Sequence, residues 1–176
     1  PLKETDTLVP LSEYAKSKVK CHRYGLKWSA QNNVRFTTLR VFNVIGNDQF
    51  KENLFLKLIR LKPDEKFIFQ QFNAIRDFIF IDDFISTLIK LLLNYKKISY
   101  DTLNIGTGVP ILIPHLIELM SQALKRELMD SIAINNMVKL NSSYASINRL
   151  KNIIHLKGFK SVDEILNLLI KENDNV

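Results

Sequence analysis

Cysteine is almost missing from this 176-residue sequence, which contains Cys21 alone. A single cysteine excludes a disulfide within the chain and suits a reducing compartment. The most apolar stretch, 84–93, is interrupted by serine, threonine and lysine, so it falls short of the ~20 residues that cross a bilayer. Residues 1–7 have neither the basic flank nor the apolar centre of a secretory signal. We therefore expect a soluble, cytoplasmic protein without membrane attachment.

Glycine is also scarce, with five residues in the chain. They nowhere form the G-x-G-x-x-G turn that places a dinucleotide pyrophosphate at a helix N-terminus. Gly106 and Gly108 are expected to make a tight turn instead. His22, His115 and His155 lack the spacing of a metal site. His22 is four residues past Lys18, which would allow a place near the site, and we favour a helix-surface position for it.

The charge is unbalanced, with 25 Lys and Arg against 18 Asp and Glu and a net charge of +7. The lysines are scattered and do not alternate with aromatic residues along one stripe. A nucleic-acid-binding domain is therefore the last of our hypotheses, and a steep salt dependence of DNA affinity would be its mark. A mildly basic cleft also suits an anionic small ligand such as a diphosphate.

Strands alternate with helices along the sequence, which predicts an α/β fold with a largely parallel sheet. We expect strands at 34–44 (buried), 67–69, 78–81, 103–105 and 132–134, and helices at 12–31, 53–61, 82–93, 111–124, 147–154 and 162–171. Ser12 is expected to cap the first helix, and Asp82 or Asp83 the third.

Tyr14 and Lys18 are four residues apart in the first predicted helix, so both can address one reactive centre. A free tyrosine has a pKa of about 10 and is a poor base, and a nearby ammonium favours the phenolate. Such a pair can remove a proton from a sugar hydroxyl while a hydride leaves its carbon. Tyr-x-x-x-Lys also occurs by chance in many helices, so the spacing alone is a weak signal.

Four segments give the pair its context. The first contains Glu4, Pro10, Tyr14, Ser17 and Lys18, which match the pattern E…P…YxxSK. The other three are LRVFNVIG at 39–46, RDFIFIDD at 76–83 and NIGTG at 104–108. In this order and spacing the chain resembles the extended short-chain dehydrogenases/reductases, and within them the NAD(P)-dependent nucleotide-sugar epimerases and dehydratases. The resemblance becomes thin after Gly108. The sequence departs from the family pattern at 70–73, where a Gly-Asp-Gly turn is usual, and at Ile45 and Phe80.

The resemblance implies the C-terminal part of a Rossmann-type doubly wound parallel sheet plus a small mixed substrate-binding lobe. Residues 1–46 would be the end of the NAD(P)-binding domain with its catalytic helix. Residues 47–176 would be the substrate-binding lobe, with 77–108 packing back on the sheet. For full-length members a homodimer is implied.

The resemblance also implies roles for single residues. Tyr14 would be the catalytic acid/base, and Lys18 its partner and the clamp on NAD or NADP. Phe42 would lie beside the nicotinamide. A nucleotide-diphosphate sugar would contact Asn43, Asn53, Leu54, Phe69 and Arg76, with Lys66 to Phe69 flanking the base and Arg76 pairing with a phosphate.

Each assignment has a structural alternative. Phe42 would be sheet core, as is usual for phenylalanine in a β-rich run. Asn43 would end a strand by bonding its own backbone. Arg76 would form a surface ion pair with Asp77 or Asp82.

The family's first βαβ unit and the Ser/Thr that assists the tyrosine find no match in the chain. The leading hypothesis is thus an N-terminally truncated NAD(P)-dependent epimerase/dehydratase acting on nucleotide-linked hexoses. A non-catalytic nucleotide-sugar-binding remnant or inactive gene fragment is the alternative. We expect the 176-residue chain to bind NAD(P) poorly, to turn over no nucleotide sugar, and to self-associate through uncovered apolar surface.

Overall fold

The computed structural model describes residues 1–46, 54–62, 64–69, 72–134 and 141–173. The helices are α1 (Glu13–Asn32), α2 (Leu54–Arg60), α3 (Ile81–Leu93), α4 (Ile113–Leu124), α5 (Asn148–Ile153) and α6 (Val162–Asn173). The strands are β1 (Thr38–Val41), β2 (Asn43–Ile45), β3 (Phe67–Phe69), β4 (Ala74–Arg76), β5 (Phe78–Phe80), β6 (Thr102–Ile105), β7 (Ile111–Leu112), β8 (Ile132–Ile134) and β9 (Asn141–Ser143). Short 3₁₀ turns cover Tyr95–Lys97 and Met129–Ser131. The predicted α/β class is confirmed.

The predicted strand 34–44 is wrong as a single buried strand. The chain forms β1, which pairs in parallel with β6, and then β2, which pairs in parallel with β5. The change of partner falls at Phe42, whose N–H donates to the Ile105 carbonyl, while the next N–H, of Asn43, donates to the Asp77 carbonyl. In the described part of the chain β1 pairs with β6 alone, and this edge position leaves Val41 42% exposed.

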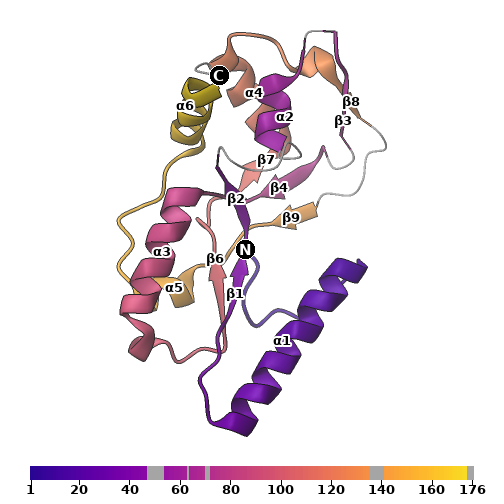
Figure 1. Ribbon diagram of the computed structural model, residues 1–176. Coiled ribbons are helices and arrows are strands. Elements are labelled where there is room, and N and C mark those ends of the chain that lie inside the picture. Colours follow the sequence, from indigo (N-terminus) through magenta and orange to yellow (C-terminus); the bar gives the residue numbers. More distant parts are fainter. Residues whose placement is uncertain (47–53, 63, 70–71, 135–140, 174–176) are drawn as a thin grey trace.

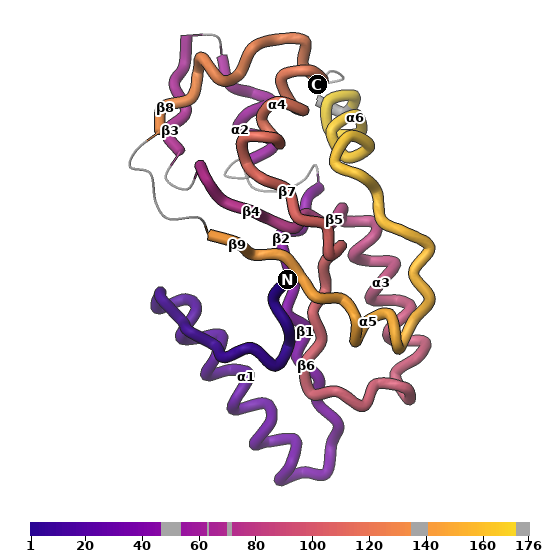
Figure 2. Tube along the Cα trace, turned by 180° about the vertical axis from the view of Figure 1, so that it is seen from behind, coloured from indigo at the N-terminus to yellow at the C-terminus, as the bar shows by residue number. Residues whose placement is uncertain are grey.

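Helix α1 begins as predicted, since the Ser12 hydroxyl accepts a hydrogen bond from the Ala15 N–H. It ends at Asn33, a residue in the left-handed conformation. The helix lies on one side of the β1–β6 pair and α3 lies on the other (Figures 1 and 2). Every residue of α1 keeps some exposure, so little packing holds it to the rest of the fold. No helix in the described ranges is long and apolar enough to span a membrane.

Helices α2, α4 and α6 gather at the opposite end of the molecule from α1, beside the β3–β8 pair (Figure 1). Between the two ends lies a small sheet of order β7-β4-β9, in which β4 runs parallel to β9 and antiparallel to β7. The sequence did not predict β4, β7 or β9 as strands. Each is two or three residues long, too short for a hydrophobic period to be recognised.

Strand β5 separates two hydrophobic clusters. Phe78 and Phe80 belong to the cluster formed with α2, α4 and α6. Ile79, between them, belongs to the cluster formed with β6 and α5. Alternate residues of a strand point to opposite faces, so this fully buried strand joins both cores. Residues next to β5 are therefore held from two sides.

The predicted aspartate cap of α3 is wrong. The cap position is Phe80, which makes no side-chain cap bond, and both aspartates lie in the first turn. There a negative charge favours the helix dipole. Asp83 instead accepts hydrogen bonds from the backbone N–H and the ammonium of Lys160, and so ties α3 to the segment before α6.

Candidate functional site

Tyr14 and Lys18 line one cavity of about 610 Å³ between α1 and β1. Tyr14 is 72% exposed, and the Lys18 ammonium nitrogen lies 5.1 Å from the centroid of its ring. Helical spacing puts both side chains on the same face, as the sequence predicted. Arg40 and Val41 of β1 form part of the opposite wall. The phenol and the ammonium are thus both available to a molecule in this cavity.

His22 lines the same cavity as Tyr14 and Lys18, so the structure favours a place near the site over the simple helix-surface position that we preferred. Its ring Nδ1 lies 2.7 Å from the hydroxyl oxygen of Thr38, so it joins α1 to β1. Cys21 also lines the cavity and is exposed. In the described part of the chain no group of three or more His, Cys, Asp or Glu side chains is arranged to hold a metal ion.

Asn43 and Arg76 both lie next to Asp77, Arg76 as its neighbour in the chain and Asn43 through hydrogen bonds. The Asn43 amide nitrogen donates to the Asp77 carbonyl at 2.9 Å, so the side chain bonds the residue between β4 and β5 rather than its own backbone. The Arg76 guanidinium donates to the carbonyls of Ile75 (2.9 Å) and Asn141 (3.0 Å). Partial burial lowers the pKa of Arg76 from its ordinary value.

The remaining predicted residues lie in packed positions. Phe42 is half-buried against the β6–α5 cluster. Phe69 is 7% exposed and makes edge-to-face ring contacts with Phe67 and Phe72 in the α2–α4–α6 cluster, against which Leu54 also packs. Asn53 lies outside the described residues. The Lys66 ammonium donates to the Asp130 carbonyl.

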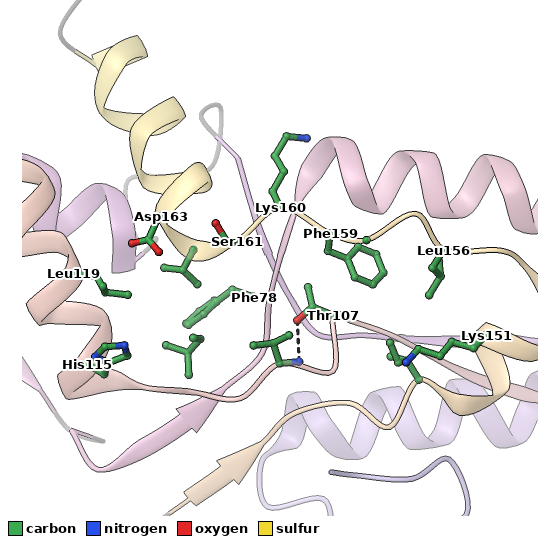
Figure 3. A pocket seen from close by; sticks show the side chains of 15 residues that line it. Phe78, Thr107, His115, Leu119, Lys151, Leu156, Phe159, Lys160, Ser161 and Asp163 are labelled. Carbon is green, nitrogen blue, oxygen red and sulfur yellow. Dashed lines mark hydrogen bonds between the residues drawn. The ribbon is translucent and has the colours of Figure 1, made fainter.

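A second cavity, of about 600 Å³, lies between α4, the start of α6 and the turn after β6 (Figure 3). Its walls are mainly apolar, and Lys151, Lys160 and Asp163 carry the charges around it. None of the predicted site residues lines it. The Lys160 ammonium is engaged by Asp82 and Asp83.

Sequence reasoning assigned no site to two buried carboxylates. Glu4 accepts a hydrogen bond from the Asn104 N–H at 3.1 Å and lies 3.9 Å from the guanidinium of Arg149. Asp77 is fully buried and accepts hydrogen bonds from the turn after β6 and from Ala145. A charged residue beside the apolar run 78–81 was the available signal, since buried charges are kept only with partners.

The parallel pairs, with helices on both sides, define a Rossmann-type α/β fold. The chain belongs to the NAD dependent epimerase/dehydratase family, whose profile matches residues 1–106. No curated protein matches the chain.

Solved structures give the same fold. RMD from Pseudomonas aeruginosa complexed with NADPH is similar with a TM-score of 0.83 and 22% identity, over 100% of this chain and 61% of that chain. The UDP-N-acetylglucosamine 4-epimerase from Methanobrevibacter ruminantium, in complex with UDP-N-acetylmuramic acid, is similar with a TM-score of 0.81 and 23% identity. The match covers 99% of this chain and 57% of that chain. UDP-glucuronic acid 4-epimerase from Bacillus cereus, in complex with NAD, is similar with a TM-score of 0.80 and 23% identity, over 97% of this chain and 56% of that chain. The chain therefore spans little more than half the length of these structures, and at such identities the likeness establishes the fold.

Proposed function

We propose that the protein carrying this chain is an NAD(P)-dependent epimerase or dehydratase of nucleotide-linked sugars. The observation that carries the proposal is the pairing of Tyr14 and Lys18 on one wall of one cavity, in a chain of this family. Tyr14 takes the proton of a sugar hydroxyl and later returns it. Lys18 lies beside the phenol ring and acts as the partner of Tyr14 and as the clamp on the cofactor.

The described residues fit one end of a nicotinamide cofactor. The Lys18 ammonium and the Tyr14 hydroxyl, both exposed in the cavity, suit the hydroxyls of a ribose. The pyrophosphate finds no comparable cradle at Gly106-Thr107-Gly108, because the N–H groups of Thr107 and Gly108 already donate to Asp77. When bound, such a cofactor supplies the hydride acceptor and donor.

Asn43 and Arg76 are the proposed contacts of the nucleotide sugar. One N–H of the Asn43 amide is given to the Asp77 carbonyl, and within the described ranges its side-chain oxygen and second N–H are left for a ligand. Arg76 carries a fixed positive charge on a half-buried guanidinium, which suits a diphosphate. Leu54, Phe69 and Phe42 act, in this proposal, by shaping the walls around the ligand.

The test is turnover by the polypeptide encoded around this chain, defined first by reading the coding DNA upstream of Pro1. UDP-, GDP- and dTDP-hexoses are supplied with NAD⁺ or NADP⁺, and products are followed by NMR. Tyr14→Phe and Lys18→Met should each lower turnover by roughly 10²- to 10⁴-fold.

Helix α1 offers a matched control. Lys20 and Tyr24 are also four residues apart and both are exposed, and neither lines the cavity. Lys20→Met and Tyr24→Phe should leave turnover unchanged. Equal losses from both pairs would mean that α1 is merely destabilised, and full activity of Tyr14→Phe would refute the catalytic role.

A further inference from the structure

Asp77 occupies the single position between β4 and β5, where the chain passes from the β7-β4-β9 sheet to the β2–β5 pair. The residue is fully buried. Its carbonyl accepts two hydrogen bonds from Asn43, one from the backbone N–H at 3.2 Å and one from the side-chain amide at 2.9 Å. One residue therefore fixes both the strand and the side chain of Asn43.

The carboxylate of Asp77 is held by four donors. One oxygen accepts from the N–H and the hydroxyl of Thr107, at 2.9 and 2.6 Å. The other accepts from the N–H groups of Gly108 and Ala145, at 2.9 and 3.0 Å. A carboxylate is an acceptor with room for about four donors, so every position is used within the protein and none is left for a ligand.

The hydrogen bond from the Ala145 N–H links the Asp77 carboxylate to the strand that contacts Arg76. Ala145 follows β9, which pairs in parallel with β4 so that Arg76 lies opposite Ser143. The same strand provides the Asn141 carbonyl that accepts from the Arg76 guanidinium. The Asp77 carboxylate thus fastens the strand against which Arg76 is held, while its carbonyl fastens Asn43.

We propose that Asp77 is a positioning residue for nucleotide-sugar binding, acting through Asn43 on one side and Arg76 on the other. This inference rests on the proposed function, which makes Asn43 and Arg76 the ligand contacts. Asp77 itself touches no ligand. Charge-assisted hydrogen bonds are stronger than neutral ones. Four of them, three from backbone N–H groups and one from the Thr107 hydroxyl, hold the junction in one arrangement before the ligand arrives.

The variant of choice is Thr107→Val, which removes one donor to the carboxylate and keeps the three bonds that the carboxylate accepts from backbone N–H groups. The Val109 N–H loses its acceptor, the Thr107 hydroxyl, at the same time. Asp77→Asn is less suitable, because its NH₂ group would face buried N–H donors and could prevent folding. The matched control is Thr87→Val in α3. Thr87 is 2% exposed and Thr107 is 8% exposed, and the Thr87 hydroxyl donates a part-buried hydrogen bond to the Asp83 carbonyl.

Affinity of the 176-residue chain for UDP-glucose and UDP is measured by calorimetry, with thermal unfolding recorded for each variant. Thr107→Val should weaken UDP-glucose binding about fivefold or more, whereas Thr87→Val, at a similar loss of stability, should not. In the Arg76→Ala, Asn43→Ala background the effect of Thr107→Val should vanish, because coupled residues are not additive. An undiminished effect in that background overturns the proposal.

A second readout needs no ligand. The side-chain N–H resonances of Asn43 and Arg76 should move in Thr107→Val and stay in place in Thr87→Val; unmoved resonances in Thr107→Val overturn the positioning role. If Arg76→Ala and Asn43→Ala leave UDP-glucose binding unchanged, or wild type does not bind it, the assignment of the ligand site fails. The resonances then decide alone whether Asp77 positions these two side chains.

Discussion

Gly106→Ala is expected to destabilise the fold by crowding the Asp77 carboxylate. A Cβ at residue 106 would lie 2.7 Å from a carboxylate oxygen of Asp77 and 3.0 Å from the Cβ of Ala145. The oxygen that must move is the one that accepts from Gly108 and Ala145. Among described glycines only Gly108 and Gly158 have positive φ, so the backbone at 106 accepts alanine, and contact is the cause of any damage.

The magnitude follows from those two bonds. Hydrogen bonds to a charged group contribute about 1.5–3 kcal/mol each, and displacement by a few tenths of an ångström weakens both without breaking them. Loss of about half of each gives roughly 1.5–3 kcal/mol for the two bonds. Replacing glycine by alanine recovers about 0.4–1 kcal/mol through the unfolded chain. We expect a net destabilisation of about 1.5 kcal/mol.

Urea unfolding followed by circular dichroism measures this change. The double variant Gly106→Ala, Ala145→Gly removes the methyl–methyl contact and keeps the closer contact with the carboxylate, so it should stay destabilised. Full recovery in the double variant would show that Ala145 is the obstacle. Wild-type stability of Gly106→Ala would refute the reasoning, because the carboxylate would then have room to move.

Three further outcomes are expected. Phe55→Ala removes a fully buried ring in edge-to-face contact with Phe78 (5.1 Å between centroids) and should lower the free energy of unfolding in urea by about 3–5 kcal/mol. Ile68→Ala, at a side chain that is 61% exposed, should lower it by about 0.5 kcal/mol. Equal losses in the two variants would contradict the assigned core. The 176-residue chain should self-associate as its concentration rises, as measured by sedimentation velocity. The reason is that α1 exposes Tyr24 (71%) and Trp28 (44%), and that β1 pairs on one side only among the described strands. A monodisperse monomer at all concentrations would contradict this. Hydrogen bonds from the backbone and then the side chain of Ser161 lower the pKa of Glu164 below 4.5, so its contribution to stability is present above pH 4.5 and is lost as the pH falls through the lowered pKa. Glu164→Gln should therefore be less stable than wild type at neutral pH and equal to it in acid, and a constant difference across the pH range would argue against the linkage.

The elements with strong local signals were predictable. Helix α1 follows from Ser12 and a long run of helix-forming residues, and β5 and β6 follow from short apolar runs next to polar turns. The break at Phe42 was not predictable, because 34–44 is uniformly rich in β-formers. Which neighbour a strand takes depends on segments far along the chain, here Ile105 and Asp77.

The candidate site shows the same division. The spacing of Tyr14 and Lys18 alone placed them on one face of a helix, since the helical period fixes which side chains share a face. The order of the motifs around them indicated the family. Tertiary structure alone decided three contacts of the site and its surroundings. His22 faces β1, Asp83 holds Lys160, and Asp77 joins Asn43 to the strand against which Arg76 is held. Each depends on hydrogen bonds between residues 16 to 77 positions apart, and such pairs leave no periodic trace in the sequence.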